Sequence, residues 1–313
     1  MSWKKPKAYA VRHIDNNVVN NSRSGGVFTA LTDYVLENEG VIYGSVLNKV
    51  YSAKHIRASD VEKRNLMRGS KYIQSSMGNT YLDVKQDLLS GNLVLFSGTS
   101  CQIDGLRKFL GKDFDNLISV DIVCHGVPSK KVWSRYLEWQ EKREKGKIVK
   151  VDFRNKKKFG WRAHFESLVF EDGHQIDSNV YAKLFYDHTI LRPSCYECPY
   201  KKIMHPGDIT IADFWGIETA VPKYDDDKGV SLVMINNDRG NKFFQLIDNV
   251  EVFSVEIEKC LQPPLIAPFP KPKIKRKLFW HDFKTKSFDY IVKKYTWVRH
   301  LSKLRTIISR KRG

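Results

Sequence analysis

Residues 92–101 read NLVLFSGTSC, an apolar run that ends in small, turn-forming residues. The stretch from Gln102 to Leu110 follows at helical period, and residues 117–123 (LISVDIV) read as a second buried strand. A strand–helix–strand unit of this kind has parallel strands and a right-handed crossover. Cys101 and Cys124 follow the two strands. Both should therefore leave the same edge of the sheet, where open α/β folds place their ligands.

The flanking sequence predicts further strands and helices. Residues 24–26 (SGG) form a glycine turn that feeds a helix, and residues 41–47 read as a strand. Residues 130–145 have the apolar spacing of an amphipathic covering helix, residues 164–170 and the run after His174 read as a hairpin around an Asp-Gly turn, and residues 208–215 alternate like a strand. The predicted fold class is α/β, with a mixed, partly parallel sheet, flanking helices, a hairpin-containing insertion and a basic helical C-terminal tail.

Composition narrows the class of protein. The chain has 313 residues and a formal net charge of +18, and 42% of its residues are hydrophobic, which suits a globular core. No signal peptide and no apolar run long enough to cross a bilayer is evident, so we expect a cytoplasmic protein. Residues 271–313 contain fifteen Lys or Arg against Asp282 and Asp289, which places +13 of the charge in this tail.

The cysteines indicate metal or cluster chemistry. Five cysteines in a chain of this length, two of them spaced as Cys195-x-x-Cys198, do not resemble the dense framework of a small secreted protein. A cuboidal iron–sulfur cluster needs four converging thiolates, and Cys101 and Cys124 could supply the other two. Zinc remains an alternative for the same residues, and an inert core role remains open for Cys101 or Cys124 alone. We expect Cys260 to be inert.

Three motifs together resemble one family. They are FSGTSCQ at 96–102, DIVCHGVP at 121–128 and RPSCYECP at 192–199, and shorter matches include SGGV at 24–27 and GDITIADFWG at 207–216. The sequence resembles the coenzyme F420 hydrogenase/dehydrogenase beta-subunit family over roughly residues 20–270. It is similar to a short bacterial type, because it lacks the cysteine-rich ferredoxin-like segment that precedes this region in many relatives.

The resemblance implies an iron–sulfur flavoprotein oxidoreductase. It implies a [4Fe-4S] cluster held by Cys101, Cys124, Cys195 and Cys198, and FAD, or FMN, near Ser24, Gly25, Gly26 and Lys71. Coenzyme F420 is a candidate hydride carrier, and the electron partner is a redox protein or a hydride carrier of unknown identity. We divide the chain into an N-terminal flavin and hydride-cofactor region (1–91), an iron–sulfur and flavin domain (92–270) and a basic, aromatic-rich helical tail (271–313).

Several of these assignments have simpler alternatives. The glycine pair is also an ordinary turn, Lys71 is also an exposed lysine, and His125 is either a neighbour that tunes the cluster or a buried, satisfied histidine. Where relatives have Gly-Thr-Pro-Cys-Gln, this chain has Ser100 in place of the proline. A serine can still make the turn.

Other functions are open to the same residues. The rivals are a zinc-stabilised transferase or other non-redox enzyme, a basic nucleic-acid-binding protein, which lacks a recognisable reader module, and a thiol enzyme with Cys101 as nucleophile and His125 as base. The aromatic and basic tail could instead dock on anionic lipid at the inner face of the plasma membrane, or it could form a packed terminal helix. Family association also suggests a cell-surface polysaccharide pathway.

Overall fold

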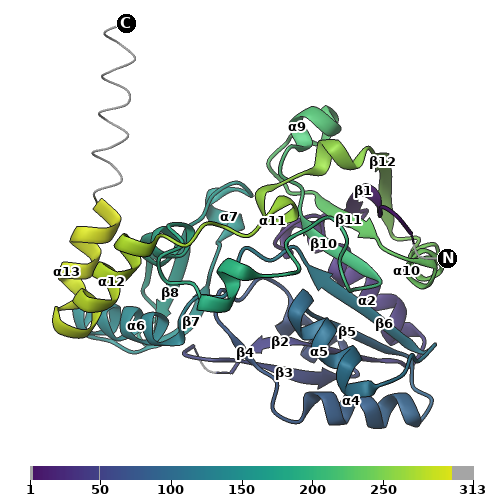
Figure 1. Ribbon diagram of the computed structural model, residues 1–313, viewed down its shortest axis with the longest axis horizontal. Coiled ribbons are helices and arrows are strands. Elements are labelled where there is room, and N and C mark those ends of the chain that lie inside the picture. The colour runs from purple at the N-terminus through teal and green to yellow at the C-terminus, as the bar shows by residue number, and fades with distance from the viewer. Residues whose placement is uncertain (1–2, 49, 298–313) are drawn as a thin grey trace, which may run out of the picture.

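The computed structural model describes residues 3–48 and 50–297, with helices packed on a large mixed sheet (Figure 1). Within these residues the main sheet has nine strands in the order β12-β1-β11-β10-β6-β5-β2-β3-β4. Its strands are β1 (Lys7–His13), β2 (Val41–Leu47), β3 (Ala53–Ala58), β4 (Ser75–Ser76), β5 (Val94–Thr99), β6 (Leu117–Ile122), β10 (Ile209–Asp213), β11 (Ser231–Ile235) and β12 (Val250–Val255). A second sheet has three strands, β7 (Ile148–Asp152), β8 (Glu166–Phe170) and β9 (Gln175–Ser178), in that order.

The helices join these strands or lie beside them. The α-helices are α1 (Asn16–Asn20), α2 (Val27–Glu37), α3 (Val61–Met67), α4 (Thr80–Leu89), α5 (Ser100–Leu110), α6 (Lys130–Glu144), α7 (Lys156–Phe159), α8 (Val180–Tyr186), α9 (Ile217–Ala220), α10 (Asp238–Phe244), α11 (Pro263–Ile266), α12 (Lys273–Thr285) and α13 (Phe288–Val292). Short turns are the 3-10 helices η1 (Pro193–Glu197), η2 (Pro222–Tyr224) and η3 (Ile257–Cys260) and the π-helix η4 (Lys293–Trp297).

The fold class predicted from the sequence is confirmed. Strand β5 pairs in parallel with β6 and with β2, and β6 pairs in parallel with β10. The remaining pairs at the β12 end are antiparallel, with β1 between β11 and β12. The expected hairpin is the antiparallel pair β8 and β9, around the turn at Gly173.

Apolar side chains cover both faces of the central strands. Helices α2 and α10 pack on one face through Leu31, Val35 and Phe243, against a cluster that includes Leu95 of β5 and Ile118 of β6. Helices α4 and α5 pack on the other face through buried side chains that include Val84, Leu88, Ile103 and Leu106. The central parallel strands are thus buried on both faces, as parallel strands require.

A separate hydrophobic cluster joins the small sheet to the C-terminal helices. Helix α6 supplies Trp133 and Tyr136, and α12, α13 and η4 supply buried side chains that include Phe279, Phe283, Phe288, Ile291 and Tyr295. The sequence leaves two uses open for the aromatic residues of the tail, contact with a membrane or packing as a terminal helix. Most of these rings lie in the core, as expected for a packed terminal helix.

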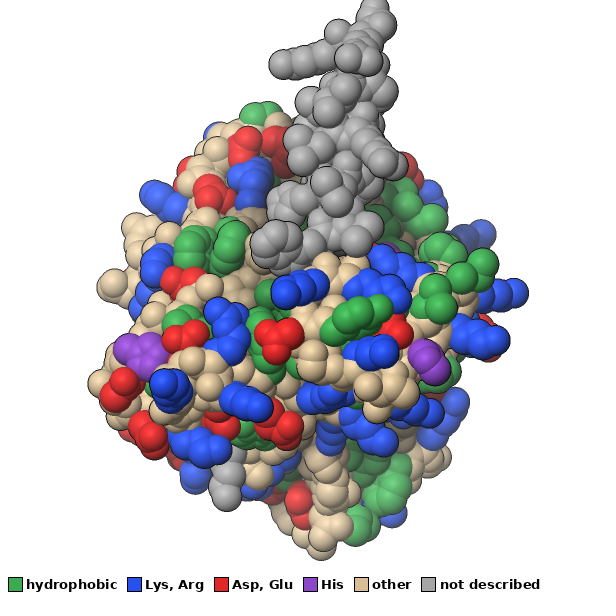
Figure 2. Space-filling view, turned by 90° about the vertical axis from the view of Figure 1, so that its left-hand side faces the viewer, with side chains coloured by type: hydrophobic (Ala, Val, Ile, Leu, Met, Phe, Trp, Pro, Cys, Tyr) green, Lys and Arg blue, Asp and Glu red, His purple; other side chains and the backbone are tan. Residues whose placement is uncertain are grey.

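The outer face of this end of the molecule is basic. On it, Lys and Arg side chains are mixed with acidic and hydrophobic ones (Figure 2). Ile274 of α12 is 78% exposed and Leu278 is 50% exposed. Contact of this surface with anionic lipid stays a prediction, and residues 298–313, including Leu301, lie outside the described residues. None of the helices in the described ranges has the length and apolar composition needed to cross a membrane.

The division of the chain at residues 91 and 92 also stays a prediction. Strand β2 from the first region pairs with β5 from the second, and β1 lies between β11 and β12. Both regions therefore contribute to one sheet.

Replacement of Gly25 by alanine tests the packing of the turn before α2. An added Cβ would lie 2.4 Å from the Val11 carbonyl oxygen and 2.7 Å from the Ser231 backbone nitrogen. We expect Gly25→Ala to lower the free energy of unfolding by up to about 3 kcal/mol, the upper range for overpacking. Urea unfolding measures the change. Gly173→Ala is the control, because its Cβ would meet nothing within 4 Å and only its positive φ of 87° opposes the change, at about 1 kcal/mol. Equal losses in both variants would contradict the packing role.

Candidate cofactor and cluster site

Cys101 and Cys124 lie at the same edge of the main sheet, as their strands predict. Gly98 and Thr99 of β5 are the register partners of Asp121 and Ile122 of β6. Helix α5 begins directly after β5, where the Gln102 side chain accepts a hydrogen bond from the Thr99 N–H at 2.9 Å. Cys101 therefore lies in the first turn of α5, where the helix dipole favours a thiolate.

Cys195 and Cys198 reach this edge through a pairing of two loops. The loop after β6 forms a bridge between Pro128 and Leu191, and the Arg192 N–H donates to the Val127 carbonyl at 2.8 Å. This pairing places η1, which contains Cys195, against residues 126–128. The Val127 N–H points at Cys195 Sγ, with 3.4 Å between nitrogen and sulfur.

The four thiols interact electrostatically. Burial raises the pKa of Cys124 to about 12, with smaller contributions in the same direction from Cys101 and Cys195. Burial also raises the pKa of Cys195, and Cys198 and Cys101 add to that increase. The pairwise influences link all four cysteines into one group. The contact between Val127 and Cys195 places Cys195 beside the loop that follows Cys124, and the assignment of all four cysteines to one cluster stays a prediction.

The four cysteines do not form a ready-made metal-ion site. In the described part of the chain, no three or more His, Cys, Asp or Glu side chains are arranged to hold a metal ion. A tetrahedral zinc site needs its ligands about 2.0–2.3 Å from the ion, whereas a cuboidal cluster is a larger body with one thiolate at each of four corners. The choice between zinc and a cluster therefore stays a prediction.

Hydrogen-bond donors and a cation face the sulfurs. The backbone N–H groups of Gly126 and Val127 lower the pKa values of Cys124 and Cys195 respectively, against the larger effect of burial. Lys201, which is 6% exposed, interacts electrostatically with Cys124, Cys198 and Cys195. Sequence reasoning missed Lys201, although its place three residues after Cys198 was a usable signal. These groups would stabilise anionic sulfur.

The His125 ring contacts a second histidine and three aromatic rings. Its Nε2 lies 2.9 Å from Nε2 of His188, and the ring packs against Phe185, Tyr186 and Phe269. Burial lowers the pKa of His125 to about 3. Its backbone carbonyl accepts a hydrogen bond from Lys201 at 2.8 Å. The contact of His125 with the site therefore runs through its backbone. Cys260 is buried and its Sγ lies 3.3 Å from the Glu256 carbonyl oxygen, which fits the expected inert role.

The glycine turn before α2 packs on the protein's own sheet. Gly26 caps α2 with a φ of 91°. The Gly25 N–H donates to Ser231 Oγ at 3.0 Å, and Ser24 Oγ donates to the Val230 carbonyl at 2.5 Å. The close approach that requires Gly25 is thus to β1 and β11. The helix start still presents backbone N–H groups to a neighbouring anion.

Lys71 is a helix cap in this structure. Its ammonium group donates to the carbonyls of Leu66, Met67 and Arg68 at 3.0, 2.7 and 3.1 Å, at the end of α3. Burial, with a smaller contribution from Arg23, lowers its pKa to about 7. A direct contact between Lys71 and a phosphate would need one of the three ammonium N–H groups. All three already donate to backbone carbonyls.

The buried side-chain donors without partners belong to residues that sequence reasoning missed. Nε of Arg23, Nε and Nη2 of Arg68 and Nε2 of His13 are buried and have no hydrogen-bond partner among the described residues. His13 interacts electrostatically with Arg68, and Arg23 with Lys71 and Lys156. We call Arg23, Arg68, Lys71 and Lys156 the cation cluster; His13 lies beside it, and burial lowers the pKa of its imidazole, which favours the neutral form. Buried donors are normally satisfied, so an anionic group such as a phosphate would complete this site.

Acidic side chains lie beside the cation cluster, but they do not neutralise all of its positive charge. Asp152 accepts from Arg23 Nη2 at 2.5 Å, and Asp33 pairs with Arg64 at 2.5 Å. Burial lowers the pKa of Lys156 to about 8, with Arg23 as the next cause. Positive charge thus remains uncompensated here. It surrounds the turn that the resemblance assigned to the flavin.

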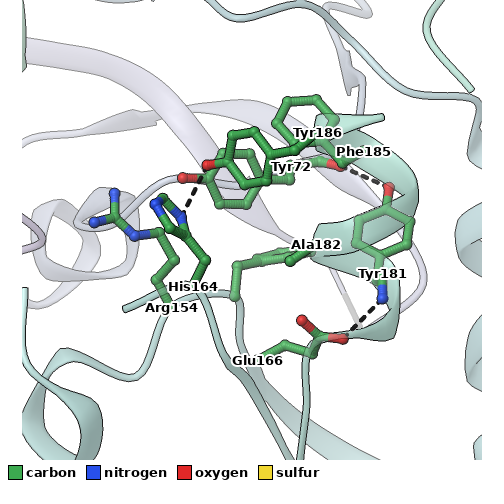
Figure 3. Close-up of a pocket in the computed structure, with 9 residues that line it drawn as sticks. Tyr72, Arg154, His164, Glu166, Tyr181, Ala182, Phe185 and Tyr186 are labelled. Atoms are coloured by element: carbon green, nitrogen blue, oxygen red, sulfur yellow. Dashed lines mark hydrogen bonds between the residues drawn. The ribbon is translucent and has the colours of Figure 1, made fainter. Parts of the chain in front are cut away.

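A small cavity near the hairpin is too small for a cofactor. Tyr72, Arg154, His164, Glu166 and Tyr186 lie around it, with four further residues (Figure 3). It has room for about one water molecule. His164 Nδ1 lies 3.0 Å from the Tyr186 hydroxyl, and the Tyr181 N–H donates to Glu166 at 2.9 Å. This cavity belongs to the core.

Comparison with known proteins identifies the family. Residues 91–259 match the family described as the C terminus of the coenzyme F420 hydrogenase/dehydrogenase beta subunit. The chain belongs to this family. Membership supports an oxidoreductase role.

A solved structure shares the fold of this family member. It is the xenon-derivatised F420-reducing [NiFe] hydrogenase complex from Methanosarcina barkeri, of which one chain is 20% identical, with a TM-score of 0.55 and 94% of each chain covered. A search among curated proteins gave no significant match.

Glu166 should make stability depend on pH. Burial raises its pKa from 4.5 to about 7, although the Tyr181 N–H and the Tyr136 hydroxyl favour the charged form. The native state therefore holds this proton to higher pH than the unfolded state, and the free energy of unfolding should fall between these two values, by about 3 kcal/mol in total. Urea unfolding at about pH 5 and about pH 8 measures the slope. We expect Glu166→Gln to lack this component and Glu171→Gln, in the exposed turn, to keep it. An unchanged slope in Glu166→Gln would contradict the assignment.

Proposed function

We propose that this protein is an iron–sulfur flavoprotein oxidoreductase that moves electrons between a flavin, one [4Fe-4S] cluster and a hydride carrier or substrate. The observation that carries the proposal is geometric: Cys101 and Cys124 follow strands that end together, and the bridge between Pro128 and Leu191 sets Cys195 Sγ 3.4 Å from the Val127 nitrogen. When bound, the flavin would take up the two electrons of one hydride and release them one at a time, and the cluster would carry those single electrons.

The residues present fit a cluster. Cys101, Cys124, Cys195 and Cys198 would hold it, and the N–H groups of residues 126 and 127 would donate to their sulfurs. Lys201 would offset the negative charge of the thiolates and the inorganic core.

The residues present also fit a cofactor with phosphates. The unpaired nitrogens of Arg23, Arg68 and His13 would bind the pyrophosphate of FAD or the phosphate of FMN. The N-terminus of α2 would add backbone donors and the positive end of its dipole. Lys71 would contribute its charge from the end of α3. The positive field needed for an anionic cofactor is thus built from residues of four different segments.

The family and its structural neighbour suggest candidates for the electron partner. The neighbour comes from a complex named as F420-reducing, so coenzyme F420 is a candidate hydride carrier for this chain, and a protein redox partner is a second candidate. We place the protein in the cytoplasm, with residues 271–313 as the candidate contact to the inner membrane face. A role in a cell-surface polysaccharide pathway stays a prediction.

Alanine replacement of each cysteine tests the cluster. We expect Cys101→Ala, Cys124→Ala, Cys195→Ala and Cys198→Ala each to lose iron, acid-labile sulfide and visible absorbance after anaerobic purification, because every corner needs its thiolate. Cys260→Ala is the matched control and should keep all three. Wild-type protein with zinc but no iron would refute the cluster and favour the zinc-stabilised alternative.

Neutral replacement of Arg68 tests the cation cluster. We expect Arg68→Gln to weaken FAD binding by about tenfold, because a charge-assisted hydrogen bond to phosphate contributes about 1.5–3 kcal/mol. Titration of flavin-free protein with FAD, followed by flavin fluorescence, gives the dissociation constant. Arg143→Gln, at a 52% exposed side chain on α6, is the control for lost charge and should bind as the wild type does. Equal affinity in Arg68→Gln and the wild type would place the flavin elsewhere.

A further inference from the structure

His205 is a buried histidine that joins the three chain segments carrying the four cysteines. It is 8% exposed, and its Nδ1 lies 3.1 Å from Ser100 Oγ and 3.1 Å from Asp121 Oδ2. Ser100 is 3% exposed and Asp121 is fully buried. The contact is therefore shielded from water, where hydrogen bonds are stronger and fix geometry better than at the surface.

Each member of this trio lies close in sequence to a cysteine. Ser100 directly precedes Cys101 in α5, and Asp121 lies in β6, three residues before Cys124. His205 follows Cys198 by seven residues, in the same connection that leads to β10. One imidazole ring thus links the segment of Cys101, the segment of Cys124 and the segment of Cys195 and Cys198.

The geometry is that of a clamp and not of a proton relay. In a Ser-His-Asp relay, the hydroxyl and the carboxylate bond to opposite ring nitrogens. Here both bond to Nδ1. The other ring nitrogen, Nε2, and Asp121 Oδ1 are buried without a partner among the described residues. Three apolar side chains in place of Ser100, Asp121 and His205 would fill the same space and leave no polar atom unpaired. Packing alone therefore does not explain why polar residues occupy these positions.

We propose that His205 is a positioning residue whose Nδ1 fixes Ser100 and Asp121 and so holds Cys101 and Cys124 toward Cys195 and Cys198. The part of this inference that concerns a bound cluster rests on the proposed function. Groups behind the ligands of a metal site orient those ligands, and their loss weakens metal retention.

The experiment compares variants that keep or remove the Nδ1 donor. His205→Asn places an amide nitrogen near the position of Nδ1, whereas His205→Leu removes both ring nitrogens. Ser100→Pro removes the hydroxyl at the first position of α5, where proline is tolerated, and Thr99 has the extended φ of −74° and ψ of 156° that a following proline needs. Ser167→Ala is the matched control. Ser167 is 3% exposed, and its hydroxyl bonds to Asp177 and Asn155 in the small sheet.

The first measurement is the rate at which a ferrous chelator extracts iron from anaerobically purified protein. We expect His205→Leu and Ser100→Pro to lose iron about tenfold faster than the wild type, with a changed electron paramagnetic resonance signal after reduction. His205→Asn and Ser167→Ala should match the wild type in both. Wild-type extraction rates in His205→Leu, or equally fast loss in His205→Leu and His205→Asn, would overturn the clamp.

A second measurement separates the clamp from the proposed function. If the purified wild type contains no iron, the iron–sulfur proposal fails, and hydrogen exchange of the same iron-free protein then decides the inference. Faster amide exchange in residues 98–106, 120–127 and 195–206 together in His205→Leu, with none of it in Ser167→Ala, would support the clamp. Unchanged exchange in these segments would overturn it.

Discussion

The parallel pairing of β5 with β6 is the constraint on which the candidate site depends. Its register sets Gly98 opposite Asp121 and Thr99 opposite Ile122, so the two strands end together. The chain then turns into α5 on one side and into the loop after β6 on the other. Strand β10 also pairs in parallel with β6, so its start faces away from the edge at which β5 and β6 end, and the connection that carries Cys195 and Cys198 must pass that edge before it enters β10. The bridge between Pro128 and Leu191 fixes where that connection passes.

Buried positive charge occurs in two places, and both suit an anionic group. Lys201 faces three of the thiols, and its long side chain also packs over the Phe269 ring at 4.0 Å. The cation cluster lies around the start of α2 and the end of α3, where unpaired arginine nitrogens are buried. These few residues differ in kind from the lysines of α12, of which Lys273, Lys275, Lys277 and Lys284 are exposed. The net charge of +18 therefore indicated a basic protein, but it did not indicate which of the positive residues are placed to bind an anionic group.

The contacts of the thiols and histidines weigh against a thiol enzyme. Cys101 Sγ lies 3.1 Å from Thr99 Oγ1, and the His125 ring bonds to His188. A nucleophilic cysteine with His125 as base needs those two side chains to bond to each other. Burial also lowers the pKa of His125, which makes it a weak base. Buried aromatic residues of the tail, such as Phe279 and Phe288, pack in one cluster with Trp133 and Tyr136 of α6. These rings therefore belong to the protein core and are not free to contact nucleic acid or lipid.

Local patterns determined much of this protein. The apolar runs of β5 and β6, the helical period of α5 and α6 and the Asp-Gly turn of the hairpin each show in the sequence, because neighbouring residues fix them. The same runs placed Cys101 and Cys124 at one sheet edge, and the spacing of Cys195 and Cys198 marked them as a pair.

Only the tertiary structure decided the remainder. The insertion of β1 between β11 and β12 depends on pairing over more than two hundred residues, which no local period records. It also decided that Lys71 caps α3, that His13, Arg23 and Arg68 keep buried nitrogens unpaired, and that His205 meets Ser100 and Asp121. The sequence around a lysine, arginine or histidine does not show what surrounds its side chain in the folded protein. Whether such a side chain is solvated, caps a helix or lies unpaired in the interior is set by residues that are remote in sequence.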